Sequence, residues 1–428
     1  MILIKVTCLK QAKLAGWAYF YLMKMLFAAL LACCATSAFA QSAFTLYNTD
    51  NSDLPDNKVN CLYTDAAENI WIGTDGGLVQ VTPGGVWTVY TTADGLPDNS
   101  IRSIFVDEDG IIWAGTYLSG LVSYNGTEWT VYDPTNSGLP DYHVKAIAKD
   151  QNDTMWIGTS WGLAKWDGDE AWTAYTDENS DILVPHVNSL YIDSNNIVYA
   201  GTLNGGLAVY QEGVFSIYWT GNANIGDNTV LSIDEDAYNN KWLATSFGGL
   251  TVMTEDYEFL RFTPLTSDIV DWSVDAVRID HTQEGIIGMS TFGLHIFDNT
   301  NWEHYTTLNS DLPDDFINAI TIDASNHIWI GTESAGVAVF DKDFVSVQNL
   351  TSEGIAVFPN PTSERVLING VHAGSVLSVY SITGTMLESQ IVPEGFIWLS
   401  VSDWPQGTYY LSVEENGFTR TGLLQVVH

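Results

Sequence analysis

Short runs of alternating apolar and polar residues fill the chain from residue 44 onward, and the 3.6-residue period of an amphipathic helix is absent there. One run recurs as an aromatic residue, an apolar residue, Gly or Ala, and Thr. Its copies are Ile70-Trp71-Ile72-Gly73-Thr74, Ile112-Trp113-Ala114-Gly115-Thr116, Met155-Trp156-Ile157-Gly158-Thr159, Val198-Tyr199-Ala200-Gly201-Thr202, Lys241-Trp242-Leu243-Ala244-Thr245 and Ile328-Trp329-Ile330-Gly331-Thr332. A degenerate sixth copy surrounds Ile287, so positions 71, 113, 156, 199, 242, 287 and 329 define seven repeats spaced by 42 to 45 residues.

Each repeat contains three further strand-like runs. In the first repeat these are Val59-Asn60-Cys61-Leu62 before the aromatic run, then a run beginning Gly77-Leu78, then Trp87-Thr88-Val89-Tyr90. Turn signals such as Asp109-Gly110 separate such runs. Four short strands joined by tight turns describe one antiparallel propeller blade. The sequence therefore predicts an all-β chain with a seven-bladed β-propeller over residues 41–350.

The run Phe44-Thr45-Leu46-Tyr47 precedes the first complete repeat. It copies the fourth strand of the later units, and Leu54-Pro55-Asp56 after it copies their connector, but no blade stands before it. An open ring would leave a strand edge unpaired, and propellers usually close by building one blade from both chain ends. We expect this run to complete the seventh blade, which holds Trp329.

The repeat resembles the two component regulator propeller repeat, whose pattern is an Asp, Asn or Gly with Trp-Ile-Gly-Thr and a Gly-Leu run. The resemblance covers residues 44–347. In that family such propellers often form the periplasmic sensing part of histidine kinases. This chain contains no kinase segment.

The tail has a different pattern. A polar linker at residues 351–354 precedes short alternating strands expected at 365–368, 376–380, 396–401 and 409–413, which predict a small β-sandwich. Its motifs resemble the type A C-terminal sorting domain of the type IX secretion system: Val357-Phe358-Pro359-Asn360-Pro361, Val379-Tyr380-Ser381-Ile382-Thr383-Gly384, and Gln406-Gly407-Thr408-Tyr409-Tyr410-Leu411.

The tail resemblance implies a Bacteroidetes-type exported protein. Its residues 351–428 would be read by the outer-membrane machinery and usually cleaved on attachment to surface lipopolysaccharide. The last strand lacks the Lys common in that family, which bears on the efficiency of processing. An ordinary accessory sandwich is the alternative.

Residues 1–40 have the anatomy of an export signal. Lys24 precedes an apolar run, and Ala38-Phe39-Ala40 forms a small-x-small cleavage site before Gln41. We expect translation to start at Met23 or Met25. A lipoprotein box ending at Cys33 is one alternative, and a membrane anchor is another. After cleavage Cys61 is the remaining cysteine, and it fills a slot that takes Ser or Ala in the other repeats.

The net charge limits the classes of partner that the chain can bind. The chain has 52 Asp and Glu against 15 Lys and Arg, a net charge of -37 at pH 7. Surplus carboxylates repel polyanions, so nucleic acid and anionic lipid surfaces are excluded as partners. No nucleophile elbow, His-Glu-x-x-His, Walker loop or Cys-x-x-Cys occurs. No cofactor and no metal is predicted, and a monomer without a transmembrane segment is expected.

The repeat allows candidate residues to be placed on the propeller. The connectors that lead into the innermost strands should share one rim with the turns between second and third strands. Lys58, Arg102 and Lys145 fall there, where they could receive a carboxylate or phosphate, or merely balance acids such as Asp56 and Asp98. The same rim collects aromatic residues that could bind a ligand or plug the channel: Tyr117, Tyr142, Trp161, Phe247, Trp272, Phe292 and Phe316.

His143 and His186 hold the same repeat slot in adjacent blades. Two imidazoles facing each other across a rim could bind a metal or act as acid and base. Streptogramin-type lyases are similar in architecture, with His at a propeller rim, but no matching Glu can be assigned here.

Three functions are therefore compatible with the sequence. The first is a secreted or outer-membrane surface-attached propeller that binds a glycan or protein ligand without catalysis. The second is a lyase or hydrolase that uses His143 and His186. The third is a surface component of the secretion machinery itself, since such a component also combines propellers with such a tail.

Overall fold

The computed structural model describes residues 43–168, 171–342 and 355–428, the last range with gaps at 359, 370, 383–384, 394–395 and 416–417. The export signal expected at residues 1–40 and the linker expected at 351–354 lie outside the described residues. The chain divides into two compact units, of which Ala43–Phe344 is the larger. Within the described residues, no helix is long and apolar enough to cross a membrane.

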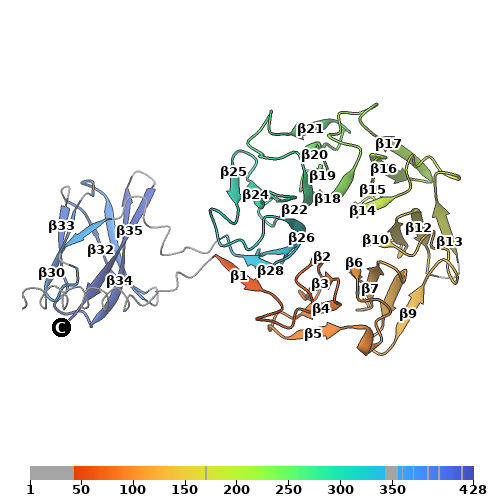
Figure 1. Cartoon of the computed structure of the whole chain (residues 1–428). Coiled ribbons are helices and arrows are strands. Elements are labelled where there is room, and N and C mark those ends of the chain that lie inside the picture. The colour runs from red at the N-terminus through yellow and green to blue at the C-terminus, as the bar shows by residue number, and fades with distance from the viewer. Residues whose placement is uncertain are drawn as a thin grey trace, which may run out of the picture. The chain divides into compact units, whose positions relative to one another are not determined.

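The larger unit is a ring of seven four-stranded antiparallel sheets (Figure 1). Blade one is β2 (Val59–Thr64), β3 (Ile70–Thr74), β4 (Leu78–Val81) and β5 (Trp87–Tyr90), followed by the short 3₁₀ helix Thr92–Asp94. Blade two is β6 (Ile101–Val106), β7 (Ile112–Thr116), β8 (Leu121–Tyr124) and β9 (Trp129–Tyr132). Blade three is β10 (Val144–Lys149), β11 (Met155–Thr159), β12 (Gly162–Trp166) and β13 (Trp172–Tyr175). The first strand of each blade lies nearest the centre of the ring.

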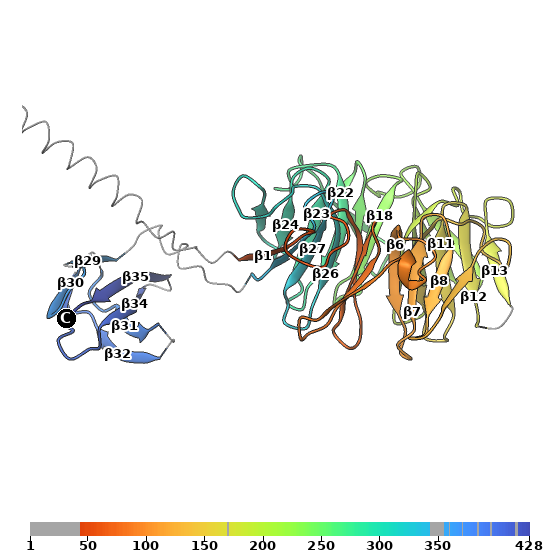
Figure 2. The same cartoon turned by 60° about the horizontal axis from the view of Figure 1, so that its bottom comes forward.

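Four more blades follow in the same order. Blade four is β14 (Val187–Ile192), β15 (Val198–Thr202), β16 (Leu207–Gln211) and β17 (Val214–Tyr218), and blade five is β18 (Val230–Glu235), β19 (Lys241–Thr245), β20 (Gly249–Met253) and β21 (Phe259–Phe262). Blade six is β22 (Val274–Ile279), β23 (Gly285–Met289), β24 (Leu294–Phe297) and β25 (Trp302–Tyr305). Blade seven is β26 (Ile317–Ile322), β27 (Ile328–Thr332), β28 (Val337–Phe340) and β1 (Phe44–Tyr47). Figure 2 shows the ring turned, with the strands running between its two faces.

The expected closure is confirmed. Strand β1 pairs antiparallel with β28, with Phe44 opposite Phe340 and Tyr47 opposite Val337. The N-terminal strand therefore supplies the outer strand of the blade that holds Trp329, and the two ends of the propeller meet in one sheet.

A hydrogen bond that recurs from blade to blade explains why the repeat needs both an Asp and a Trp. In blade one, Asp65 Oδ1 accepts the backbone N–H groups of Ala67 and Asn69, which closes the turn between the first two strands. Its Oδ2 accepts the indole N–H of Trp71 at 2.8 Å. The same bond joins Asp107 to Trp113, Asp150 to Trp156, Asp236 to Trp242 and Asp323 to Trp329, and the Tyr199 hydroxyl bonds Asp193.

Blade six corrects the sequence alignment. Strand register places Ile286, not Ile287, in the slot of the aromatic residue, because Ile286 pairs with Arg278 as Trp71 pairs with Tyr63. Without an indole N–H, Asp280 accepts from Lys342 Nζ and from Asn326 Nδ2 instead. The carboxylate thus keeps a donor although the repeat motif is lost.

The blades pack through the residues that recur from copy to copy. Trp71 lies in one buried cluster with Ile101 and Ile112 of the next blade, and Trp113 clusters with Val144 and Met155. The repeated tryptophans therefore pack between neighbouring blades. Gly158 permits the close approach, because a Cβ there would lie 2.6 Å from a methyl group of Val187 in the next blade.

Cys61 behaves as a packed residue, as expected. Its thiol is free and half-buried, and burial raises its pKa to about 12. A thiol held protonated is a poor nucleophile.

His295 on β24 is a buried histidine at a position where other blades have an apolar residue. It should make the free energy of unfolding depend on pH. The same slot holds Val79 and Val122 in blades one and two. Burial, and then the neighbouring His304 ring, lower the pKa of His295 to about 3. The folded protein therefore keeps this imidazole neutral, whereas the unfolded chain binds a proton near its ordinary pKa of about 6.5.

The contribution of neutral His295 to the free energy of unfolding is fully present above pH 6.5. It is lost as the pH falls toward 3, because the unfolded chain binds a proton that the folded protein does not. At pH 5 the loss should reach about 2 kcal/mol of unfolding free energy. Denaturant unfolding at pH 7 and pH 5 measures it, and the His295→Val variant should lose about 2 kcal/mol less than the wild type between these pH values. An equal pH dependence in the variant and the wild type would contradict the assignment.

The smaller unit is a β-sandwich. One sheet has the order β29 (Ala356–Phe358), β30 (Arg365–Asn369), β33 (Phe396–Ser400). The other has the order β32 (Met386–Ile391), β31 (Val376–Ser381), β34 (Gly407–Glu415), β35 (Phe418–Val426). The predicted fold class is therefore confirmed, although β29 and β32 were not among the expected strands.

Candidate functional site

Backbone hydrogen bonds bring the turns and connectors of the propeller to one rim, as the repeat predicted. The N–H of Tyr117, in the β7–β8 turn, donates to Ser100 O just before β6. The N–H of Gly120 in blade two donates to Tyr142 O, which precedes blade three, at 2.9 Å. The bond from Gly249 N to Trp272 O repeats this link between blades five and six.

In five blades an aspartate of the connector fixes the residue that precedes the first strand. Asp141 Oδ1 accepts the N–H of His143 at 2.7 Å, and Asp314 Oδ1 accepts the N–H of Phe316 at 3.0 Å. Such Asx turns hold the backbone rigidly. The rim side chains therefore project from an ordered frame.

The seven predicted rim aromatics are exposed, with exposed fractions between 36% and 74%. Trp161 and Phe247 are the most exposed of them. The Tyr117 ring packs edge-on against His143 at 4.7 Å, and Arg102 lies over it at 5.1 Å. Leu118 and Leu203 in the adjacent turns are exposed as well and were not predicted. The rim therefore exposes large apolar side chains in blades two to seven, where they are available to a binding partner.

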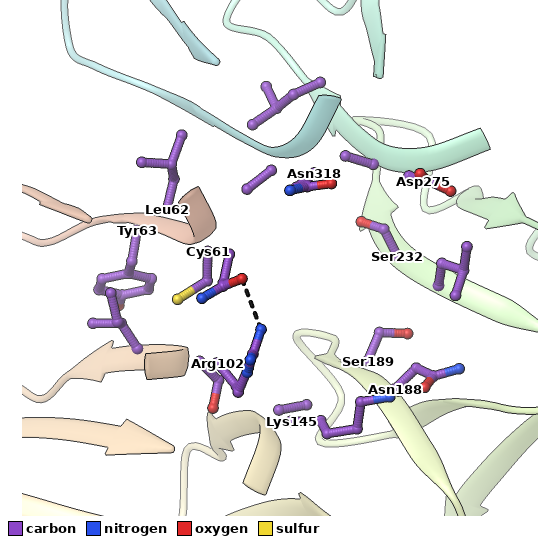
Figure 3. A pocket seen from close by; sticks show the side chains of 18 of the residues that line it. Cys61, Leu62, Tyr63, Arg102, Lys145, Asn188, Ser189, Ser232, Asp275 and Asn318 are labelled. Carbon is purple, nitrogen blue, oxygen red and sulfur yellow. Dashed lines mark hydrogen bonds between the residues drawn. The ribbon is translucent and has the colours of Figure 1, made fainter. Parts of the chain in front are cut away.

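A cavity of about 280 Å³ lies on the axis of the ring (Figure 3). It is lined by the first strands, and the slot after the first residue of each of those strands contributes one side chain per blade. In blade order these are Asn60, Arg102, Lys145, Asn188, Leu231, Asp275 and Asn318. In Figure 3 Arg102 and Lys145 lie on one side of this axial pocket, and Asp275 lies on the other.

The three predicted cations have different environments. Lys58 forms an ion pair with Glu333 at 2.7 Å, and Arg102 forms one with Asp75 at 3.0 Å. The acids suggested by the sequence instead hold the backbone, since Asp56 accepts the N–H of Lys58 and Asp98 accepts the N–H of Ser100. The balancing charges thus come from turns of the same rim that are distant in sequence.

Lys145 forms no ion pair with a carboxylate of the described residues. Its Nζ donates to Asn188 Oδ1 at 2.7 Å and meets Nε2 of His186 at 2.9 Å. Burial, followed by the charge of Arg102, lowers the pKa of Lys145. It is a half-buried cation whose neighbours are neutral or positive.

The two predicted histidines are held neutral. Burial and the charges of Lys145 and Arg102 lower the pKa of His143 to about 4, and burial and Lys145 lower that of His186. His143 Nδ1 contacts Ser160 Oγ at 3.1 Å. No group of three metal-ligating side chains occurs among the described residues.

Two family profiles match the chain. The two component regulator propeller matches residues 53–76, 95–118, 138–161 and 311–334, and the secretion system C-terminal sorting domain matches residues 356–424. No curated protein matches the chain.

Solved structures share the fold at low identity. PorZ, an essential surface component of the type IX secretion system of Porphyromonas gingivalis, is 17% identical with a TM-score of 0.57 over 87% of this chain. The extracellular domain of the hybrid two component system BT3049 of B. thetaiotaomicron is 17% identical with a TM-score of 0.61 over 91%. The chain spans 60% and 55% of the lengths of these two proteins. Virginiamycin B lyase of Staphylococcus aureus is 14% identical with a TM-score of 0.56, and the match covers 69% of this chain and 98% of the lyase.

Proposed function

Since the chain joins a propeller of two component regulator repeats to a type IX secretion sorting domain, we propose that it acts as a non-catalytic binding module on the cell surface. The sorting domain directs the protein to secretion and surface attachment. The ligand, a glycan or a protein, is held at the rim that carries the exposed aromatic side chains.

The observation that carries this proposal is the exposure of all seven predicted aromatics on one rim of the propeller. Large aromatic side chains supply much of the binding energy at interfaces, and their exposure is costly unless a partner covers them. A glycan array and a pull-down with residues 41–428 test the proposal. Binding without turnover of the captured ligand is expected, and the absence of any captured ligand would count against it.

Trp161→Ala separates a binding role from a packing role. Trp161 is 66% exposed, and the other blades carry residues as different as Asp75 and Leu118 in the corresponding turn. We expect the variant to lose roughly 1–3 kcal/mol of ligand binding free energy, with its melting temperature nearly unchanged.

Trp156→Ala is the matched control in the same blade. Trp156 is buried, stacks on Tyr175 and donates to Asp150. Its truncation should cost about 3–5 kcal/mol of stability. If Trp161→Ala unfolds the ring as readily, the rim aromatics pack the fold and the binding assignment fails.

The enzymatic alternative relies on His143 and His186. A general base works best when its pKa lies near the working pH, whereas the pKa of His143 is about 4 and Lys145 occupies Nε2 of His186. This environment favours binding over catalysis. Loss of a turnover activity in a His143→Ala variant would reverse that preference.

A role in the secretion machinery is the second alternative, favoured by the fold similarity to PorZ. A strain that lacks this protein distinguishes the two. We expect other proteins with sorting tails to remain displayed, and their retention inside the cell would support the machinery role.

A further inference from the structure

The position that lines the axial pocket holds asparagine in three blades and a charged residue in three others. In blades one, four and seven it holds Asn, whose Nδ2 donates to a backbone carbonyl of the next blade. The acceptors are Ile101 O at 3.1 Å, Val230 O at 3.4 Å and Val59 O at 3.0 Å. Asparagine is thus what blade packing uses at this slot, and the charged side chains in other blades need another explanation.

Blades two and three carry the cations Arg102 and Lys145 in this slot. The neighbouring asparagines orient them, since Asn60 Oδ1 accepts from Arg102 at 2.7 Å and Asn188 Oδ1 accepts from Lys145 at 2.7 Å. Asp75 is the one carboxylate of the described residues that forms an ion pair with either cation. Two oriented cations with one counter-charge leave a positive site in a chain of net charge -37.

Polar atoms beside these cations lack partners. Arg102 Nε, Ser103 Oγ and Ser189 Oγ are buried and make no hydrogen bond within the described residues. Ser103 is 8% exposed, and both serines line the axial pocket. The two serine oxygens lie against Gly115 and Gly201 of the second strands, in the small slot that Cys61 fills in blade one, so they belong to blade packing. Arg102 Nε is the unpaired donor that belongs to the cations themselves, and buried polar groups are normally satisfied.

Blades two and three also carry three of the exposed rim aromatics. Tyr117 belongs to blade two and touches Arg102, and Tyr142 and Trp161 belong to blade three. One sector of the ring therefore combines two cations with exposed aromatic faces. A peptide could pair with the free inner edges of the first strands, which are the terminal strands of their sheets, but pairing of that kind would not need two cations side by side.

We propose that the axial pocket binds a carboxylate-bearing sugar residue, a uronic acid at the end of a glycan, whose carboxylate lies between Arg102 and Lys145. The sugar ring lies among the first strands that line the pocket, and the rest of the glycan extends toward the aromatic rim. This inference rests on the proposed binding function and specifies its ligand class. Charge-assisted hydrogen bonds supply the selectivity for the acid.

Calorimetric titration of residues 41–428 tests the ligand class. The probes are trisaccharides of galacturonate, glucuronate and mannuronate, each compared with its methyl ester. We expect at least one acid to bind at least roughly tenfold more tightly than its ester, and its affinity to fall between 50 and 500 mM NaCl. Equal binding of acid and ester, or no binding of any acid, overturns the proposal.

Variants test the residues. Lys145→Met should weaken binding of the acid roughly tenfold or more without changing the affinity for the ester. Lys149→Met is the control, because it removes the same charge from the same strand, where Lys149 pairs with Asp153. Asp275→Asn should leave binding unchanged or tighten it, because it removes a negative charge from the opposite side of the pocket. Weaker binding by Asp275→Asn would place the anion elsewhere.

The assignment of the ligand to the axial pocket and its assignment to the rim can be refuted independently. If Trp161→Ala weakens a captured ligand but Lys145→Met does not, the rim binds and the axial assignment is wrong. If a peptide with a free C-terminus binds better than its amide while the acids do not bind, the ligand class is wrong. Circular dichroism of each variant at the titration temperature verifies that the ring is folded.

Discussion

Deletion of residues 41–48 is expected to destabilise the whole propeller and to make its unfolding less cooperative, because this segment contains the strand that closes the ring. Strand β1 provides the fourth strand of blade seven, and its loss exposes the edge of β28. The effect should therefore extend beyond the blade from which the residues are removed.

Two aromatic residues account for most of the stability that we expect this strand to contribute. Phe44 is buried and stacks on Phe340 at 4.6 Å, and Tyr47 lies between Trp87 and Trp329. Truncating one buried aromatic residue costs about 3–5 kcal/mol, and an average domain has only about 5–15 kcal/mol of stability. Loss of both should remove much of the margin.

Denaturant unfolding followed by tryptophan fluorescence measures this loss. Thr45→Ala is the control, because Thr45 is exposed and pairs with Val339 through its backbone. Phe44→Ala should already lower the midpoint clearly. A deletion variant with the wild-type midpoint would show that the ring does not depend on its closure.

The repeat made most of the fold predictable. A period near 43 residues and four alternating runs per period are enough to infer blade number, strand order and the shared rim. Closure followed from one physical argument, since a strand edge needs a partner. Blade number, strand order and the rim depend on local or periodic patterns, so they can be predicted from a single sequence.

Partners between blades were not predictable in the same way. Arg102 bonds Asn60, and Lys145 bonds Asn188, across neighbouring blades. These pairs depend on the direction and reach of each side chain toward the neighbouring blade, which the repeat spacing alone does not give. For the same reason the sequence suggested Asp98 as a counter-charge where the structure has Asp75.

Weak patterns account for the other differences. Blade six lacks the aromatic residue, so the alignment slipped by one position from Ile286 to Ile287. Strand β32 at the sheet edge is mostly exposed and has no buried face to reveal it. Where no side chain needs burial, alternation gives little signal.

Deletion of residues 351–428 should abolish surface display while leaving the propeller folded. The sorting domain has its own core, which includes Val366, Leu377, Val379 and Leu411. The propeller closes its ring with β1 and buries its own clusters, so it does not need the tail for stability. We expect the truncated protein to remain in the periplasm.

Cell fractionation and surface proteolysis of wild type and truncated strains measure this effect. The expected result is complete loss of surface exposure, with the melting temperature of the purified propeller within a few degrees of that of the longer protein. Deleting residues 41–48 makes the opposite change, since it should unfold the ring but spare the sorting domain. The two deletions together separate the sorting signal from the stability of the propeller. If the protein without residues 351–428 still reaches the surface, the propeller carries the sorting signal. If that protein unfolds, the tail supports the ring.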